Sequence, residues 1–216
     1  MWCKVIVFNV SEIVYTMARR SEHSQQEIRD MVLNAAETIV VDEGFDKLKV
    51  RKVALDIGYT VGSIYMVFNN MADLIMHVKG RTLDDIAIQL NAIDSTEIAE
   101  QKIILLAKTY LLFACNHFNR WQMIFEHQLA DNETIPDWYQ QKVKQIFRIV
   151  EVEFEGLSTA HTEAEAKQAA RALWSGIHGI CTLSLSGKLD LLGVDDIEDT
   201  VVLLVENFIL GWKQGK

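Results

Sequence analysis

A single proline among 216 residues is the feature that most constrains the fold of this chain. Proline interrupts helices and is common in turns, so one proline (Pro136) and only 11 glycines favour long helices over many short strands. Half of the residues are hydrophobic and 24% are charged, which is the composition of a globular chain long enough to bury a sizeable core. We therefore expect an all-α protein.

Apolar residues recur at helical spacing along most of the chain, and the pattern predicts about nine helices and no strand. The clearest helix start is a capping box, in which the side chains of Ser24 and Glu27 each bond the other residue's backbone N–H. Gly44 is expected to end this helix. Further helices are expected at residues 50–57, 61–69, 70–91, 94–117, 120–128, 136–156, 161–188 and 195–211.

Two of the predicted helices, at residues 50–57 and 61–69, are short and follow each other closely. Gly58 makes the turn between them and Thr60 is expected to cap the second, which is the pattern of a helix-turn-helix unit. Gly62 has no side chain, so the second helix can approach the major groove of DNA closely. The preceding capped helix supplies the third side of a small core.

The stretch from Gly44 to Leu74 resembles the TetR family of bacterial transcriptional regulators. The resemblance is carried by Gly44-Phe45, Val50-Arg51, Val53-Ala54, Gly58, Thr60, Gly62, Ile64-Tyr65, Phe68, Asn70 and Leu74. It implies a three-helix DNA-binding domain at residues 21–70, preceded by an N-terminal extension or arm at residues 1–20. The rest of the chain, residues 71–216, is then a helical effector-binding and dimerisation domain.

The second helix of the unit is expected to be the recognition helix. Val61, Ser63 and Met66 would face the bases, where Ser63 can bond a base edge and the other two can meet a thymine methyl group. The backbone amides at Thr60 and the hydroxyl of Tyr65 can bind phosphates, as the tyrosine at this place commonly does in the resembled family. The predicted DNA-binding residues are Lys49, Arg51, Thr60, Val61, Gly62, Ser63, Tyr65, Met66 and Asn69.

Three positions depart from the pattern of the resembled family. Lys49 stands where a capping Ser or Thr is usual, Met66-Val67 stand where aromatic residues or His are common, and Met71 replaces a Lys. These changes remove polar contacts, so they bear on the strength and specificity of DNA binding rather than on the fold.

The charge of the chain is unevenly distributed. The net charge is −9, of which residues 1–80 carry −1 and residues 81–216 carry −8. A near-neutral DNA-binding segment keeps an alternative open, namely a helical protein-interaction module whose DNA-reading surface has decayed. Phosphate contacts predict a steep loss of DNA affinity with salt, and this dependence would distinguish the two functions.

The last two predicted helices carry strong apolar faces. In the resembled family such helices pair with their copies in a second subunit, so we expect a homodimer. A two-fold dimer would place two recognition helices about one DNA turn apart, ~34 Å. Such a dimer is expected to act as a repressor that a small apolar effector releases.

A Trp-x-x-x-His-Gly pattern at Trp174, His178 and Gly179 resembles one subgroup of the family's C-terminal domains. Two interpretations stay open: one wall of a ligand pocket, or a packed Trp beside a satisfied buried His. Aromatic residues on neighbouring helices support a mostly apolar cavity. The predicted pocket residues are Tyr110, Phe113, His117, Trp121, Met123, Trp174 and His178.

Other classes of protein lack support in the sequence. An all-helical enzyme is the least favoured alternative, because the chain has no Glu-x-x-His pair, HExxH, GxSxG or Walker motif. Three scattered cysteines make neither a disulfide framework nor a zinc site, so we expect no metal, no cofactor and a cytoplasmic location. The longest uncharged stretch has 16 residues, whereas a membrane span needs ~20.

Overall fold

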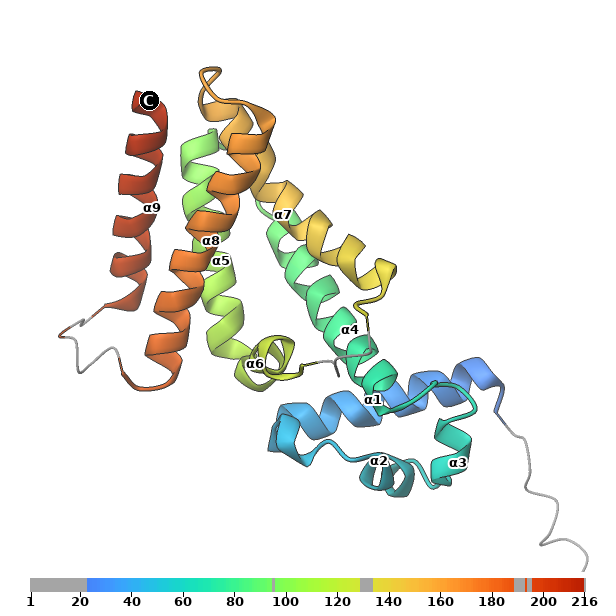
Figure 1. Ribbon diagram of the computed structural model, residues 1–216. Coiled ribbons are helices and arrows are strands. Elements are labelled where there is room, and N and C mark those ends of the chain that lie inside the picture. The colour runs from blue at the N-terminus through green and yellow to red at the C-terminus, as the bar shows by residue number, and fades with distance from the viewer. Residues whose placement is uncertain (1–22, 95, 129–133, 189–192, 194–195, 216) are drawn as a thin grey trace, which may run out of the picture.

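The structure, a computed structural model, describes residues 23–94, 96–128, 134–188, 193 and 196–215. Within these residues the chain has nine α-helices and no strand, which confirms the predicted all-α class (Figure 1). The expected arm at residues 1–20 lies outside the described residues. The elements are α1 (Gln25–Glu43), the short 3-10 helix η3 (Phe45–Lys47), α2 (Val50–Asp56), α3 (Val61–Ile64), α4 (Met71–Asn91), α5 (Ala99–Asn116), α6 (Phe118–Glu126), α7 (Asp137–Leu157), α8 (Glu163–Leu185) and α9 (Ile197–Gln214).

The predicted boundaries of α1 are confirmed. The Ser24 hydroxyl accepts a hydrogen bond from the Glu27 amide at 3.2 Å, and the Ser24 amide donates to the Glu27 carboxylate at 2.6 Å. Gly44 ends the helix with φ of 88°, a backbone conformation that glycine adopts without steric cost.

Helices α1, α2 and α3 form the lower end of the molecule in Figure 1 and enclose one hydrophobic cluster, here called the first core. Most of its fully buried members are aliphatic side chains of modest size. They include Val32, Ala36, Val40, Val53 and Ile64, each with no exposed surface. Because α2 and α3 are short, apolar contacts with α1 and with each other supply most of their stability.

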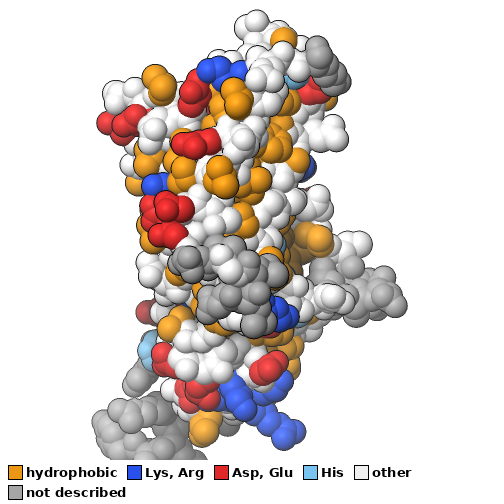
Figure 2. All heavy atoms as spheres, turned by 90° about the vertical axis from the view of Figure 1, so that its left-hand side faces the viewer, with side chains coloured by type: hydrophobic (Ala, Val, Ile, Leu, Met, Phe, Trp, Pro, Cys, Tyr) orange, Lys and Arg blue, Asp and Glu red, His pale blue; other side chains and the backbone are white. Residues whose placement is uncertain are grey.

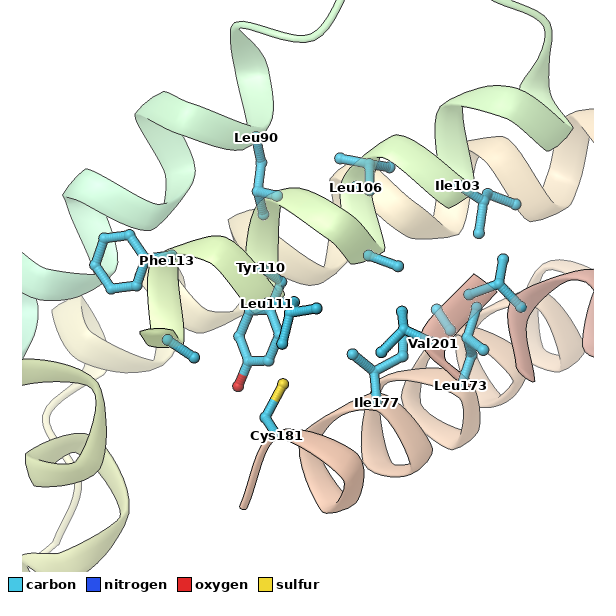
Figure 3. Packing of buried hydrophobic residues seen from close by; sticks show 14 of the residues in the cluster. Leu90, Ile103, Leu106, Tyr110, Leu111, Phe113, Leu173, Ile177, Cys181 and Val201 are labelled. Carbon is cyan, nitrogen blue, oxygen red and sulfur yellow. The ribbon is translucent and has the colours of Figure 1, made fainter. Parts of the chain in front are cut away.

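Helices α5, α7, α8 and α9 enclose a larger cluster, here called the second core. Figure 3 shows side chains of α5 facing those of α8 and α9 across this core, with the ring of Tyr110 extending towards Cys181 on α8. Aromatic side chains such as Phe113, Trp121 and Phe154 are buried within it. The C-terminal helix α9 lies on the outer side of the bundle (Figure 1).

Two helices contribute to both cores. α4 places Leu74 and Val78 in the first core and Ile86 and Leu90 in the second. The expected domain boundary at residue 70 therefore lies at the N-cap of a helix that the two cores share. α6 is also shared, because it places Trp121 in the second core and Met123 in the first.

Two helices are shorter than the apolar pattern predicts. α3 ends at Ile64 rather than near residue 69, because the Val67 amide bonds the Ile64 carbonyl three residues back and tightens the last turn. α5 begins at Ala99 rather than at residue 94, because the Asp94 carboxylate accepts a bond from the Thr96 amide and closes a local turn instead. None of the described helices combines the length and the hydropathy that a membrane span requires.

Candidate nucleic-acid interface and internal cavities

A tight turn and an N-cap orient the short helix α3. Gly58 makes the turn with φ of 71°, and the Thr60 hydroxyl accepts a hydrogen bond from the Ser63 amide at 3.1 Å. The hydroxyls of Thr60 and Ser63 also share a hydrogen bond of 2.9 Å. Because the Ser63 hydroxyl already bonds Thr60, only its remaining donor or acceptor positions can bond a base edge.

The two sides of α3 and of the turn that follows it differ sharply in exposure. Ile64 is fully buried in the first core, whereas Met66 is 72% exposed and Tyr65 is 42% exposed. Val61 is half-buried and packs against the first core. A side chain at the exposed Gly62 would meet only the Thr60 hydroxyl, at 3.6 Å, so packing inside the protein does not require glycine there.

The predicted cationic residues lie at the surface beside this helix. Lys49 and Arg51 are exposed, and neither forms an ion pair within the part of the chain that the structure describes. Lys52, by contrast, pairs with Glu43. Lys49 occupies the N-cap of α2 without a capping hydrogen bond from its side chain. Two nearby cations are thus free to meet phosphates.

The face that carries α9 shows a different distribution of side chains. Figure 2 shows Lys and Arg gathered at the end of the molecule formed by the first three helices, and hydrophobic side chains spread over the α8 and α9 face.

Asn69, the last predicted DNA-binding residue, is exposed beyond α3, and its backbone amide donates to the Asp73 carboxylate at 2.9 Å.

A hydrogen-bonded aromatic cluster lies inside the second core. The Trp121 indole N–H donates to the Tyr110 hydroxyl at 2.9 Å, and that hydroxyl lies 3.0 Å from Nδ1 of His178. An indole can only donate, so the Tyr110 hydroxyl accepts from Trp121 and keeps its own proton, which it can donate to the Nδ1 of a neutral His178. Burial lowers the pKa of His178 and favours the same neutral ring. Trp174 stacks on His178 with ring centres 5.0 Å apart.

Two apolar cavities of about 50 and 110 Å³ adjoin this cluster. Both are lined by Tyr110, Ile146, Phe147 and Trp174, and the remaining lining residues are apolar. Neither lining includes a charged side chain. The cavities are therefore suited to uncharged, apolar groups.

The structure brings four of the seven predicted pocket residues together: Tyr110, Trp121, Trp174 and His178. Both interpretations of the Trp-x-x-x-His-Gly segment find support, since Trp174 lines both cavities and His178 is a satisfied half-buried His.

Three predicted pocket residues lie elsewhere. Phe113 and His117 pack against each other near the end of α5, with ring centres 4.7 Å apart, and line neither cavity. Met123 is fully buried in the first core and lines neither cavity. It lies two residues after Trp121 on α6, and residues two apart face different sides of a helix. α6 thus packs against both cores.

Sequence reasoning missed the part of α7 that lines the cavities. The lining residues Val143, Ile146, Phe147 and Val150 follow the i, i+3, i+4, i+7 spacing of one helix face. This spacing was present in the sequence, but it does not reveal which other helix the face meets. α4 adds Leu83, Ile86 and Leu90 from the opposite side.

An exposed helix beside free cations, joined to a helical bundle with internal apolar cavities, defines the class of helix-turn-helix transcriptional regulators. Comparison with known families agrees. Residues 32–78 match "Bacterial regulatory proteins, tetR family", and residues 103–208 match "Tetracyclin repressor-like, C-terminal domain". Together these matches span more than two thirds of the chain. The chain belongs to the TetR family of transcriptional regulators.

Individual relatives agree with this assignment. The chain is 25% identical over 176 residues to an uncharacterized HTH-type transcriptional regulator of Mycobacterium tuberculosis, which covers 81% of this chain and 78% of the relative. Because the family consists of transcriptional regulators, the enzyme alternative is set aside.

Solved structures share the fold. A protein of unknown function from Rhodococcus sp. RHA1 aligns with a TM-score of 0.72 and 19% identity, over 89% of this chain and 98% of that chain. BioQ, solved with its natural double-stranded DNA operator, aligns with a TM-score of 0.61 and 16% identity, over 84% of this chain and 98% of that chain.

Proposed function

We propose that this regulator is a homodimeric repressor that binds a roughly palindromic operator and is released by a small, uncharged, apolar effector. The observation that carries the proposal is the segment formed by α3 and the turn after it, which anchors Ile64 in the first core and presents Tyr65 and Met66 to solvent. A large apolar side chain held at the surface directly after a capped helix fits contact with thymine methyl groups in a major groove.

The DNA contacts follow from the chemistry of the exposed groups. Tyr65 would donate its hydroxyl to a phosphate, while Met66 and Val61 would meet thymine methyl groups. Lys49 and Arg51 have no ion pair to give up within the described residues, and so they would neutralise phosphates at little cost. The likeness in fold to BioQ, which was solved with an operator, supports double-stranded DNA as the partner.

The α8 and α9 face supports the homodimer. Leu203 is 61% exposed, and Leu183 and Leu210 are exposed on the same pair of helices. The space-filling view shows hydrophobic side chains spread over this face (Figure 2). A second copy of the chain would remove them from water and place two recognition helices about one DNA turn apart.

The cavities indicate the chemistry of the effector. An ionised ligand would lose its hydration without meeting a charged partner, so the lining favours an uncharged apolar molecule. The cavities of about 50 and 110 Å³ are also small beside the ~300–1,000 Å³ of typical ligand sites. An effector would therefore bind best to a state in which α7 has moved outward, and it would shift the population towards that state.

The operator is tested first, by titrating purified protein against the DNA upstream of its own gene at two salt concentrations. We expect binding that outlasts competitor DNA and weakens steeply with salt. Tyr65→Ala should weaken it, and Tyr65→Phe, which keeps the ring, tests the hydroxyl alone. If neither this DNA nor a selection from a random duplex library gives a bound sequence, the interaction-module alternative takes first place.

The effector is tested separately. Candidate molecules are ranked by the thermal shift they cause, and each is then tested for release of the selected duplex. Val143→Phe should fill the cavity of about 110 Å³ and abolish the thermal shift while leaving duplex affinity within about twofold. If molecules that cause a thermal shift never change duplex affinity, the coupling between the two sites is wrong.

A further inference from the structure

A line of four side chains and one backbone group joins the first turn of α7 to the end of the recognition helix α3. Trp138 of α7 stacks on His77 of α4, with ring centres 4.6 Å apart and planes 10° from parallel. His77 Nε2 lies 2.6 Å from an Nη atom of Arg29 on α1. The other Nη atom of Arg29 donates to the Val67 carbonyl at 2.5 Å, and the guanidinium lies 4.3 Å from the centre of the Phe68 ring.

The far end of this line holds the segment that follows α3. The amides of Val67 and Phe68 both donate to the Ile64 carbonyl at 3.0 Å, so this last turn is tight. Arg29 binds the outward carbonyl of the same turn, where a cation also suits the partial negative charge of a helix end. α1 thus holds the backbone directly beside the exposed residues Tyr65 and Met66.

The middle of the line requires a neutral His77. Arginine only donates hydrogen bonds, so His77 must accept through an unprotonated Nε2. The charged groups that face His77 are Arg29 from α1, Asp73 and Arg81 from α4, and Lys142 from α7. Burial, followed by the charge of Arg29, lowers the pKa of His77 and favours the neutral ring that the hydrogen bond needs.

The near end is shaped to receive the indole of Trp138. A Cβ atom at Gly80, one helical turn after His77, would lie 2.8 Å from the Trp138 ring, so the ring rests where α4 has no side chain. Trp138 precedes by one to three turns the α7 residues Val143, Ile146 and Phe147, which line the cavities. An outward movement of α7 would therefore act on the contact between Trp138 and His77.

We propose that Arg29, His77 and Trp138 are positioning residues that couple α7 to the DNA-reading helix. While α7 is packed, Trp138 holds the His77 ring, His77 holds Arg29, and Arg29 holds the Val67 carbonyl in place. When α7 moves outward, the stack opens and Arg29 loses its alignment, which frees the turn after α3. The regulatory part of this inference, in which an effector moves α7, rests on the proposed function. The mechanical part, in which contacts from Trp138 to the Val67 carbonyl hold the turn after α3, does not.

Hydrogen exchange of the full-length protein, without DNA or ligand, tests the mechanical part. Trp138→Leu, His77→Phe and Arg29→Met should each speed exchange of the amides of residues 67–69 by about two- to tenfold, the factor expected from losing one hydrogen bond. His77→Phe keeps a ring for the stack, so it isolates the acceptor nitrogen. The double variant of Trp138→Leu and Arg29→Met should exchange no faster there than Arg29→Met alone.

Two further variants separate this coupling from a general weakening of the contact between α4 and α7. Asp84→Asn removes the ion pair with Lys142 between the same two helices, keeps the charge of Lys142 near His77, and should leave residues 67–69 unchanged. Gly80→Ala displaces the Trp138 ring while raising the helix propensity of α4, so faster exchange at residues 67–69 cannot then reflect a weaker helix. This variant also serves if Trp138→Leu fails to fold.

The exchange rates at residues 67–69 and the affinity for duplex DNA test the proposal separately. Unchanged exchange at residues 67–69 in folded Trp138→Leu and Gly80→Ala, or an equal rise in Asp84→Asn, would overturn the proposal. Failure to bind any duplex would overturn the proposed function and leave the exchange result standing. With a selected duplex, Trp138→Leu should also reduce affinity by about two- to tenfold, the factor expected from losing one hydrogen bond.

Discussion

The first and second cores of this protein place polar and apolar groups in opposite ways. The first core buries compact aliphatic side chains such as Val40, Val53 and Ile64, and its polar groups and cations lie outside. The second core buries aromatic rings, and it holds the hydrogen bonds between Trp121, Tyr110 and the half-buried His178 beside apolar cavities.

This difference suits two distinct tasks. Tightly packed aliphatic residues resist displacement, so the first core keeps a short helix in a constant orientation at the surface. Small cavities beside flat aromatic rings leave the second core room to change its packing, as binding of the proposed effector would require. In the proposed function, the first core is rigid where the protein would contact the groove, and the second core is adaptable where the effector would bind.

The largest expected effect concerns the packing of α3. Ile64→Ala should lower the free energy of unfolding by ~2–5 kcal/mol, because it removes a fully buried side chain and leaves a cavity. Met66→Ala, at an exposed position two residues later, should change it by less than ~0.5 kcal/mol. Urea denaturation of the two variants measures the contrast. Similar losses for both would show that α3 is not anchored as described.

The next effect concerns the buried hydrogen bonds of the second core. Tyr110→Phe should cost ~1–3 kcal/mol of stability, because it leaves the buried Trp121 N–H without its partner. Tyr139→Phe is a matched control, since the Tyr139 hydroxyl makes no hydrogen bond within the described residues. Equal denaturation midpoints for Tyr110→Phe and the parent protein would contradict a structural role for the hydroxyl.

At the proposed DNA interface the expected effects are smaller. Tyr65→Ala should weaken binding to the selected duplex by about tenfold, the equivalent of one charge-assisted phosphate hydrogen bond of ~1.4 kcal/mol. Arg51→Ala should reduce the slope of log affinity against log salt concentration by about one. Fluorescence anisotropy over a salt series measures both. A slope that Arg51→Ala leaves unchanged would show that this cation does not meet a phosphate.

The smallest effect is a dependence of stability on pH. Burial holds the pKa of His178 below its usual value of 6.5, so the folded state favours the neutral ring. This contribution to stability is complete above the pKa of His178 in the unfolded chain, and it is lost as the pH falls through the lower pKa in the folded state. The slope is less than ~1.4 kcal/mol per pH unit, because solvent screens a half-buried ring. Tm measured from neutral to acidic pH should fall less in His178→Gln. His77, whose pKa is also lowered, should add to the slope that remains.

Local chemistry in the sequence determined the helices and most of their ends. The capping box at Ser24, the left-handed turn at Gly44 and the N-cap at Thr60 lie where the pattern predicted them. Each depends on contacts within a few residues along the chain, which the sequence displays directly. The same local pattern carried the resemblance to the TetR family, and the family matches confirm it.

Only the tertiary structure decided which face of each helix meets which core. Met123 and Trp121 share α6, yet one enters the first core and the other the second. Phe147 of α7 lines the cavities. Trp138, in the first turn of the same helix, contacts His77 and through it Arg29 on α1. Helical periodicity fixes a direction relative to the helix axis, and the partner on that side depends on how distant helices pack together.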